Sequence, residues 1–193
     1  MLRRSLISAL AFTVAALVAP MARAQAVAAD AFVKQLSSEV VDAVKGDKAI
    51  QSGDVARIRA LVDTKVMPHV NFDRMTAMSV GPQWRSATPD QRKRMLEEFK
   101  LLLVNTYSGA MTQVKDQTIF VKPLRVAPVD GEVVVKSEVR GSGEPIQLDY
   151  RLEKTPGMGS GWQIFNLNVL GVWLVETYRS QFAQEINAKG VDG

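Results

Sequence analysis

Apolar residues between positions 30 and 111 recur three and four residues apart, which is the spacing of amphipathic helices. The first predicted helix begins at Asp30 and ends near Gly46, because glycine commonly terminates a helix. Its apolar stripe consists of Phe32, Val33, Leu36, Val40, Val41 and Val44. Asp54 is expected to cap a second helix carrying Val55, Ile58, Leu61 and Val62, and a short third helix is expected over Phe72 to Val80.

The strongest helix start lies at Thr88. Thr88 can cap the helix, Pro89 suits the first helical position, and Gln91 can reach back to the cap, as in a capping box. The pattern predicts one long helix of about 20 residues that runs past Phe99 and Leu103 towards Gly109.

The hydrophobic period then switches to that of β-strands. Asp-Gly and glycine-rich breaks separate the β-rich segments, and such breaks are hairpin signals. The connections are too short for crossover helices, so an antiparallel meander is expected. A last helix follows Gly171. Strands are predicted at Thr118–Val126, Glu132–Arg140, Pro145–Lys154 and Gly161–Val169.

This order of elements predicts an α+β fold. N-terminal helices and the long helix would pack on a curved antiparallel sheet of about four strands, followed by a C-terminal helix. In the third strand Ile146 and Leu152 share a face. In the last strand, strict alternation places Phe165, Leu167 and Val169 on one face and Trp162 and Ile164 on the other. Periodicity alone does not distinguish a filled core from a hollow one.

The first 24 residues have the character of a secretory signal peptide. Arg3 and Arg4 precede an apolar run from Leu6 to Val18, and Ala22-Arg23-Ala24 offers small side chains at the positions that a signal peptidase reads. The run is too short for a membrane span of about 20 residues. We therefore expect cleavage before Gln25 and a single exported, soluble domain over residues 25–193.

The signal peptide also explains most of the basic charge. The whole chain has 24 Lys plus Arg and 20 Asp plus Glu, a net charge of +4. Arg3, Arg4 and Arg23 would leave with the signal peptide, so the mature chain has 21 basic and 20 acidic groups and a net charge of +1. This balance removes the basis for predicting a nucleic-acid partner.

Catalytic and metal-binding motifs are missing from the sequence. The chain has no Cys and one His, which excludes disulfides, thiol chemistry and multi-His metal sites. His69 is interpreted as structural. Asp149 and Glu153 alternate with basic residues, as on a solvated sheet face. The run from Arg92 to Arg94 is either a solvated helix face or a patch that steers the protein towards an anionic partner.

Several stretches resemble the MlaC family of periplasmic phospholipid-binding proteins, which is associated with toluene tolerance. The resemblance covers nearly the whole mature chain in the same order, although a hopanoid-handling branch is similar. The matching stretches are Asn71–Met75, Gly81–Arg85, Ala87–Gln91, Glu98–Ala110, Leu148–Leu152, Gly161–Ile164, Gly171–Val175, Tyr178–Phe182 and Lys189–Gly193.

The resemblance implies a periplasmic shuttle that is not an enzyme and needs no cofactor or metal. Its cargo would be phospholipid, held by the acyl chains in an apolar cavity. Its partners would be an outer-membrane lipoprotein–porin complex and an inner-membrane ABC transporter complex with a substrate-binding membrane subunit. Such a pathway maintains the lipid asymmetry of the outer membrane. Hopanoid or another lipid is the alternative cargo.

The candidate lipid-binding residues lie on or next to the matching stretches and flank the expected interface between sheet and helices. They are Trp84, Leu103, Tyr107, Tyr150, Ile164, Val169, Val172, Trp173 and Val175. Met75, Met78 and Met111 would suit a cavity wall, because methionine fills irregular shapes. Two alternatives remain. An enzyme would point Asp149 or His69 into the cavity, and a protein-interaction module would have a filled core.

Overall fold

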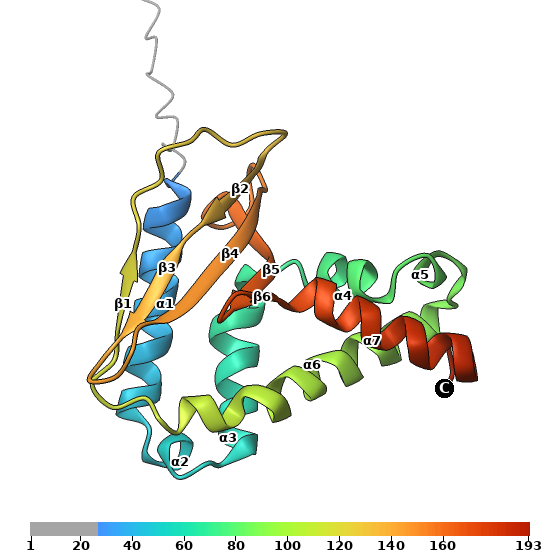
Figure 1. Ribbon diagram of the computed structural model, residues 1–193, viewed down its shortest axis with the longest axis horizontal. Helices are drawn as coiled ribbons and strands as arrows, with labels where there is room; N and C mark the ends of the chain where they lie inside the picture. Colours follow the sequence, from blue (N-terminus) through green and yellow to red (C-terminus); the bar gives the residue numbers. More distant parts are fainter. Residues whose placement is uncertain (1–26) are drawn as a thin grey trace, which may run out of the picture.

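The computed structural model describes residues 27–193. The expected signal peptide and its cleavage site lie outside these residues. Figure 1 shows an upright part, in which α1 lies behind the sheet, and a helical arm that extends to the side. The long helix α6 belongs to both parts, because it runs from the end of the arm to the base of the sheet.

The predicted helices are present. They are joined by short helical turns that the sequence pattern did not indicate. The helices are α1 (Ala29–Gly46), α2 (Lys48–Gln51), α3 (Val55–Leu61), the π-helix η1 (Val62–Val66), the 3₁₀-helix η2 (Met67–His69), α4 (Phe72–Val80), α5 (Gln83–Ser86), α6 (Pro89–Met111) and α7 (Leu174–Lys189).

Side-chain caps mark the starts of α3 and α6. The Asp54 carboxylate accepts the Arg57 N–H at the start of α3, and the predicted capping box at the start of α6 forms between Thr88 and Gln91. Such caps satisfy backbone donors that the first helical turn leaves free. At the other end of α4, Gly81 adopts a φ of 78°, which favours glycine and stops the helix.

The sheet is an antiparallel meander, as predicted, but it has six strands rather than about four. The strand order is β1-β3-β4-β5-β6, and β2 pairs with β4 beyond the end of β3. β1 ends well before the predicted Val126, just ahead of Pro123, which cannot donate a ladder hydrogen bond. The strands are β1 (Thr118–Val121), β2 (Glu132–Val135), β3 (Ser137–Arg140), β4 (Ile146–Lys154), β5 (Trp162–Val169) and β6 (Val172–Trp173).

The second predicted strand is interrupted at Lys136 by a side chain from β4. The buried Asp149 carboxylate accepts the Ser137 N–H at 3.1 Å, and the Ser137 hydroxyl donates to the Leu148 carbonyl oxygen. These two bonds replace backbone bonds of the ladder, so one continuous segment is divided into β2 and β3. Asp149 therefore has a structural role.

A bulge in β5 overturns the predicted faces of that strand. Ile164 pairs with Leu152 and Asn166 pairs with Arg151, which leaves Phe165 without a partner on β4. The extra residue shifts the alternation of side chains. Ile164, Leu167 and Val169 consequently all line the same cavity. Phe165 turns to the opposite face, where the Arg74 guanidinium lies 3.7 Å from its ring centroid.

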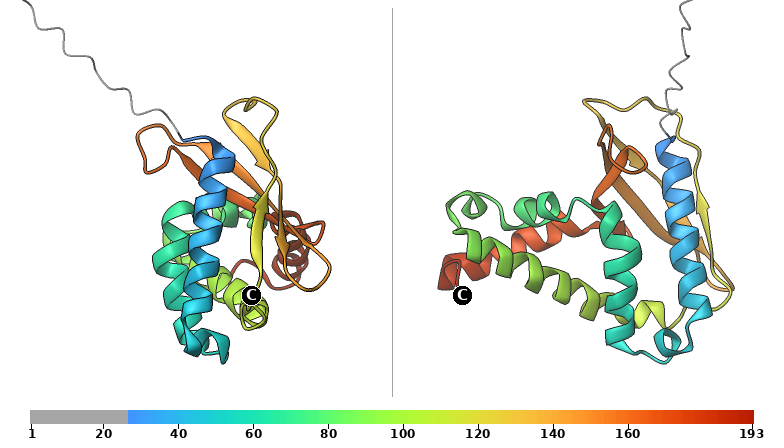
Figure 2. Two further views of the ribbon diagram at one scale, coloured as in Figure 1. Left: turned by 90° about the vertical axis from the view of Figure 1, so that its left-hand side faces the viewer. Right: turned by 180° about the vertical axis from the view of Figure 1, so that it is seen from behind.

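Three hydrophobic clusters form the core. The first joins α1 to one half of the sheet through residues such as Phe32, Val33 and Leu152. The second joins α4, α6 and α7 around Phe99 and Tyr178. The third joins the C-terminal end of α1 to α2, α3 and the C-terminal half of α6. Figure 2 shows the helices from two further sides. They run in different directions beside the sheet and do not form one layer.

Candidate functional site

A large apolar cavity lies where the three clusters meet. Its volume is about 440 Å³, within the range of roughly 300–1,000 Å³ that is common for small-molecule sites. The walls come from the segment between α3 and α4, from the C-terminal half of α6, and from the inner face of β3, β4 and β5. Of the 26 lining residues, 21 are apolar, counting tyrosine as apolar, so the cavity suits a hydrocarbon ligand.

The sheet wall consists of side chains that alternation directs inwards. Leu148 and Tyr150 come from β4, and Leu167 and Val169 come from β5. Leu148, Leu167 and Val169 are only half buried although they face the interior. Ile146, the first residue of β4, also lines the cavity and is 43% exposed. Residual exposure on an inward face indicates that this part of the sheet borders empty space.

The helical wall is formed largely by one face of α6. Leu103, Val104, Tyr107 and Met111 follow one another at helical spacing along the cavity. Met75 from α4 also lines it. The third methionine proposed for the wall, Met78, instead packs against the cluster around Phe99.

Opposite the sheet, the wall departs from regular α-helix. Four residues of the irregular segment, Val62, Val66, Met67 and Val70, line the cavity. Val62 and Val66 belong to the π-helix η1, and Met67 begins the 3₁₀-helix η2. π-helices are rare and occur frequently at functional sites. The hydrophobic period did not reveal this segment, although its valines and methionine supply much of the apolar surface.

An aromatic cluster closes the cavity towards the helical arm. Phe72 lies on the cavity wall and stacks on Phe99, with ring centroids 5.6 Å apart. Phe99 meets Tyr178 edge-on at 5.0 Å and Phe182 at 5.2 Å. Aromatic pairs at these distances stabilise each other beyond their buried area. These contacts give the cavity a firm end on the side of the arm.

Two tyrosines contribute hydroxyl groups without bringing charge to the walls. The Tyr150 hydroxyl lies 3.0 Å from the Ser37 hydroxyl, and burial raises the pKa of Tyr150. Burial also raises the pKa of Tyr107, and the neighbouring Tyr178 adds to this shift. Both phenols therefore stay neutral at physiological pH, and the cavity keeps its apolar character.

Five lining residues are polar: Lys100, Ser108, Gln113, Gln117 and Asn166. The Asn166 side chain is already engaged, because its carbonyl oxygen accepts the Val175 N–H at 3.1 Å and its amide donates to Glu176. These bonds tie the start of α7 to β5. The other four polar residues come from α6 and the segment that follows it.

The structure places five of the nine candidate lipid-binding residues on the cavity wall: Leu103, Tyr107, Tyr150, Ile164 and Val169. All five come from α6, β4 and β5. Their position brings them together around one space, while direct contact with lipid stays a prediction.

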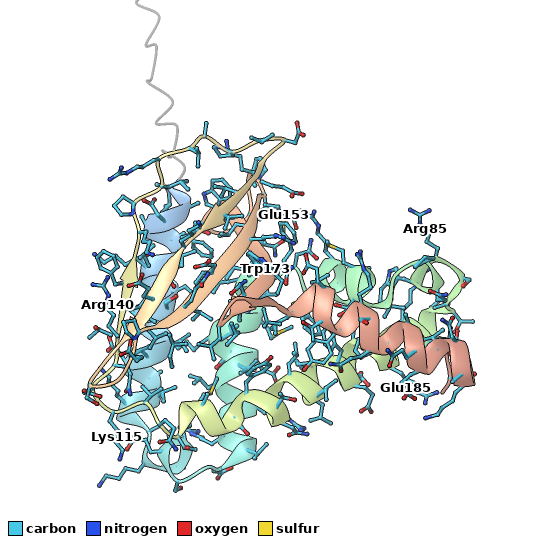
Figure 3. All side chains as sticks on the ribbon, in the orientation of Figure 1. Arg85, Lys115, Arg140, Glu153, Trp173 and Glu185 are labelled. Atoms are coloured by element: carbon cyan, nitrogen blue, oxygen red, sulfur yellow. The ribbon has the colours of Figure 1, made fainter. Side chains whose placement is uncertain are left out.

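The other four candidate residues lie outside the lining. Trp84 is half buried in α5, with the Arg92 guanidinium 5.6 Å from its ring centroid. Val172 is 52% exposed on β6, and Arg151 stacks on Trp173, labelled in Figure 3 where the sheet passes into α7. Val175 is buried in the cluster around Phe99. For these four residues, lipid contact is an expectation from sequence alone.

The residues considered for catalysis do not face the cavity. The His69 ring packs edge-on against Phe32, with centroids 5.6 Å apart, as expected for a structural histidine. Glu153 accepts hydrogen bonds from Asn71 and Arg74. Neither these residues nor Asp149 belong to the lining. Arg92 is also engaged, because its guanidinium donates to the carbonyl oxygens of Trp84 and Arg85.

Two further observations concern the described part of the chain. None of the helices between residues 27 and 193 combines the length and the apolar character that crossing a bilayer requires. The same stretch contains no group of three or more His, Cys, Asp or Glu side chains placed to share a metal ion.

Comparison with known families and structures identifies similar proteins. The family model described as MlaC protein matches residues 34–193. A solved structure with a TM-score of 0.80 and 41% identity covers 85% of this chain and 90% of the other. It is a phospholipid-binding protein from Ralstonia solanacearum in complex with a phospholipid.

Two characterised relatives are more distant. The intermembrane phospholipid transport system binding protein MlaC of Haemophilus influenzae is 19% identical over 162 residues, which are 83% of this chain and 75% of that protein. The toluene tolerance protein ttg2D of Pseudomonas putida is 30% identical over 108 residues. That match covers 56% of this chain and about half, 49%, of the Pseudomonas protein.

Proposed function

The chain belongs to the MlaC family, and from that premise we propose that it is a lipid carrier. It holds the acyl chains of a phospholipid in the cavity and carries the lipid across the periplasm. Residues 25–193 form one lipid-binding domain after the first 24 residues have been removed during export. The protein exchanges lipid with an outer-membrane lipoprotein–porin complex and an inner-membrane ABC transporter complex, and so supports outer-membrane lipid asymmetry.

The cavity is the observation that carries this proposal. It has a volume of about 440 Å³ and 21 apolar residues among its 26 lining residues. A protein-interaction module would have had these side chains packed against one another. The resemblance to a structure that contains a phospholipid gives the cavity its expected occupant.

The energetics of lipid transfer explain why such a cavity suffices. Exposure of an acyl chain to water costs about 0.8 kcal/mol per methylene. A diacyl lipid with roughly 30 methylenes therefore resists free transfer by on the order of 20 kcal/mol. A carrier removes this barrier by replacing one apolar environment with another. No bond is made or broken, so the proposed function is binding and not catalysis.

The five candidate residues on the wall would contact the acyl chains. Leu103 and Tyr107 approach from α6, while Tyr150, Ile164 and Val169 approach from the sheet. Release requires only that a partner stabilise the opened or emptied state of the carrier. Neither step needs a cofactor or a metal ion.

Native mass spectrometry of the protein purified from the periplasm tests the proposal. We expect a mass increment that matches phospholipid, and lipid extraction should identify the headgroup. A protein that is purified without lipid and takes none up from phospholipid vesicles would rule out carriage. A hopanoid in place of phospholipid would support the alternative cargo, and cavity-dependent turnover of a lipid ester would support an enzyme.

A further inference from the structure

The wall of the cavity carries one charge. Among the lining residues of the described chain, Lys100 is the one with a formally charged side chain. It lies on the same face of α6 as Leu103, Val104 and Tyr107, at the spacing of neighbouring helical turns. An ammonium group beside an apolar wall is costly unless it is paired or hydrated. Its presence at this position needs a reason that apolar packing does not supply.

Lys100 lies at the rim, where the cavity meets water. The Lys100 side chain keeps 30% of its surface exposed and that of Asp63 keeps 40%. The Lys100 Nζ donates to Asp63 Oδ1 at 2.8 Å. Asp63 belongs to η1, so the pair joins the two helical walls of the cavity across its rim. An ammonium has three donors, and this bond uses one of them.

We propose that Lys100 recognises the phosphate group of the bound lipid. This inference rests on the proposed function and adds the residue that distinguishes lipids with a phosphate next to their acyl chains from lipids without one. With the chains in the cavity, a phosphate at the rim accepts a hydrogen bond from Lys100. Bonds between an ammonium and a phosphate are charge-assisted and roughly twice as strong as neutral ones.

Asp63 has two effects in this arrangement. It keeps Lys100 paired while the cavity is empty, so the ammonium is not left alone beside apolar side chains. It also competes with the phosphate for Lys100. Because partly exposed ion pairs contribute little net stability, an incoming phosphate can share or replace the bond to Asp63 at small cost.

The same geometry disfavours cargo without phosphate. A neutral polycyclic lipid or a diacylglycerol offers Lys100 only uncharged oxygens, in hydroxyl or ester groups, and these are weaker acceptors than a phosphate. Such lipids can still fill the apolar space. Lys100 is therefore expected to set a preference between lipid classes while the apolar wall supplies most of the affinity.

A competition between two lipids that differ only in the phosphate tests this. Delipidated protein is incubated with mixed vesicles of phosphatidic acid and diacylglycerol with identical acyl chains, and native mass spectrometry gives the ratio of the two bound lipids. We expect the wild type to favour phosphatidic acid and Lys100→Gln to lower that ratio about tenfold, the worth of one charge-assisted hydrogen bond. Lys100→Arg should retain the preference.

Two further variants make the test specific. Asp63→Asn removes the competitor and should raise the ratio above that of the wild type. Lys93→Gln removes an exposed positive charge from the same helix, away from the cavity, and should leave the ratio unchanged. Equal effects of Lys93→Gln and Lys100→Gln would mean that general surface charge sets the preference, and this would overturn the proposal.

The remaining outcomes separate the inference from the proposed function. If Lys100→Gln binds both lipids in the wild-type ratio, Lys100 does not recognise phosphate, although lipid carriage stands. If neither lipid binds to the wild type, the proposed function itself fails. Inorganic phosphate and glycerol phosphate serve as chain-free probes in NMR titrations. Binding of either at Lys100 as tight as that of phosphatidic acid would indicate a site for free phosphate, and would overturn the lipid-headgroup assignment.

Discussion

The two ends of the inner sheet face differ in what lies opposite them. Near Lys154, Val135 and Leu152 are fully buried against α1. Near Ile146, the same face borders the cavity, and Leu148 is only half buried. The residue types and the alternation are alike in the two halves, so composition does not make one half solid and the other hollow. The difference comes from the helices.

The helices opposite the hollow half are held by contacts among themselves. α6 packs through Phe99 on α4 and α7, and through Val104 on α3. These clusters lie on either side of the cavity and keep α6 away from the sheet, whereas α1 lies directly on the strands through Phe32 and Val33. A cavity can therefore persist in a close-packed protein when its walls are braced by separate cores.

A matched pair of truncations in β4 should give the largest contrast between the two halves. Leu152→Ala removes a side chain with no exposed surface and should destabilise the protein by about 3 kcal/mol, because it leaves a new void. Leu148→Ala enlarges a space that already exists, and should cost about 1 kcal/mol. Urea unfolding of the lipid-free protein measures both values. Equal losses would show that the half near Ile146 is as well packed as the other.

A charge placed on the wall should separate lining residues from exposed ones. Leu103→Asp puts a carboxylate into the cavity, where its desolvation opposes acyl chains, and should lower the bound lipid per protein about tenfold. Val126→Asp is the control. Val126 is 69% exposed and lies outside the lining, so this variant should leave the lipid content unchanged. Native mass spectrometry of folded protein gives the stoichiometry. Unchanged lipid in Leu103→Asp would remove Leu103 from the site.

The smallest expected effect concerns Glu176, which joins α7 to the sheet through an ion pair with Arg151 and a hydrogen bond from Asn166. Burial tends to raise the pKa of Glu176, but hydrogen bonds from Asn166 and Arg151 outweigh it and lower the pKa overall. The ionised form is thus favoured in the fold, so this contribution is present above the ordinary carboxyl pKa of about 4.3 and is lost as the pH falls below it. Because the Glu176 side chain is 48% exposed, the effect should stay below about 1 kcal/mol.

Denaturation curves of the wild type and Glu176→Gln at neutral and acidic pH isolate this contribution. The variant should be slightly less stable at neutral pH, and the two proteins should converge in stability below the carboxyl pKa. A constant difference at every pH would assign the role of Glu176 to packing and not to charge.

The fold could be read from the sequence where the signal is local. The capping box at Thr88, the stripe of α1 and the Asp-Gly break before β2 each depend on residues close together in the chain. The bulge at Phe165 and the split at Lys136 could not be read from the sequence. The split depends on Asp149 of β4, which is distant in the chain, and the alternation in β5 does not mark the extra residue. Hydrophobic alternation assumes a regular strand, and both features interrupt that regularity.

The site could be predicted only in part for a similar reason. The matching stretches indicated Leu103 and Ile164, which the structure places on the cavity wall, and also Trp84 and Val175, which it places elsewhere. Membership of a stretch does not say which way a side chain faces. The π-helix wall was missed because Val62 and Val66 fit an ordinary helical stripe. Lys100 lay within a matching stretch, but only its place on the wall distinguishes it from other surface lysines.

The bulge in β5 has a consequence for changes in chain length. Phe165 is the extra residue beside the pair formed by Asn166 and Arg151, and its side chain turns away from the cavity. If one residue were deleted from this strand, the bulge could be absorbed, and Ile164, Leu167 and Val169 would still face inwards. β4 has no extra residue, so a single deletion there would turn Ile146 and Leu148 towards water. Insertions and deletions should therefore be tolerated unequally by two adjacent strands of the same wall.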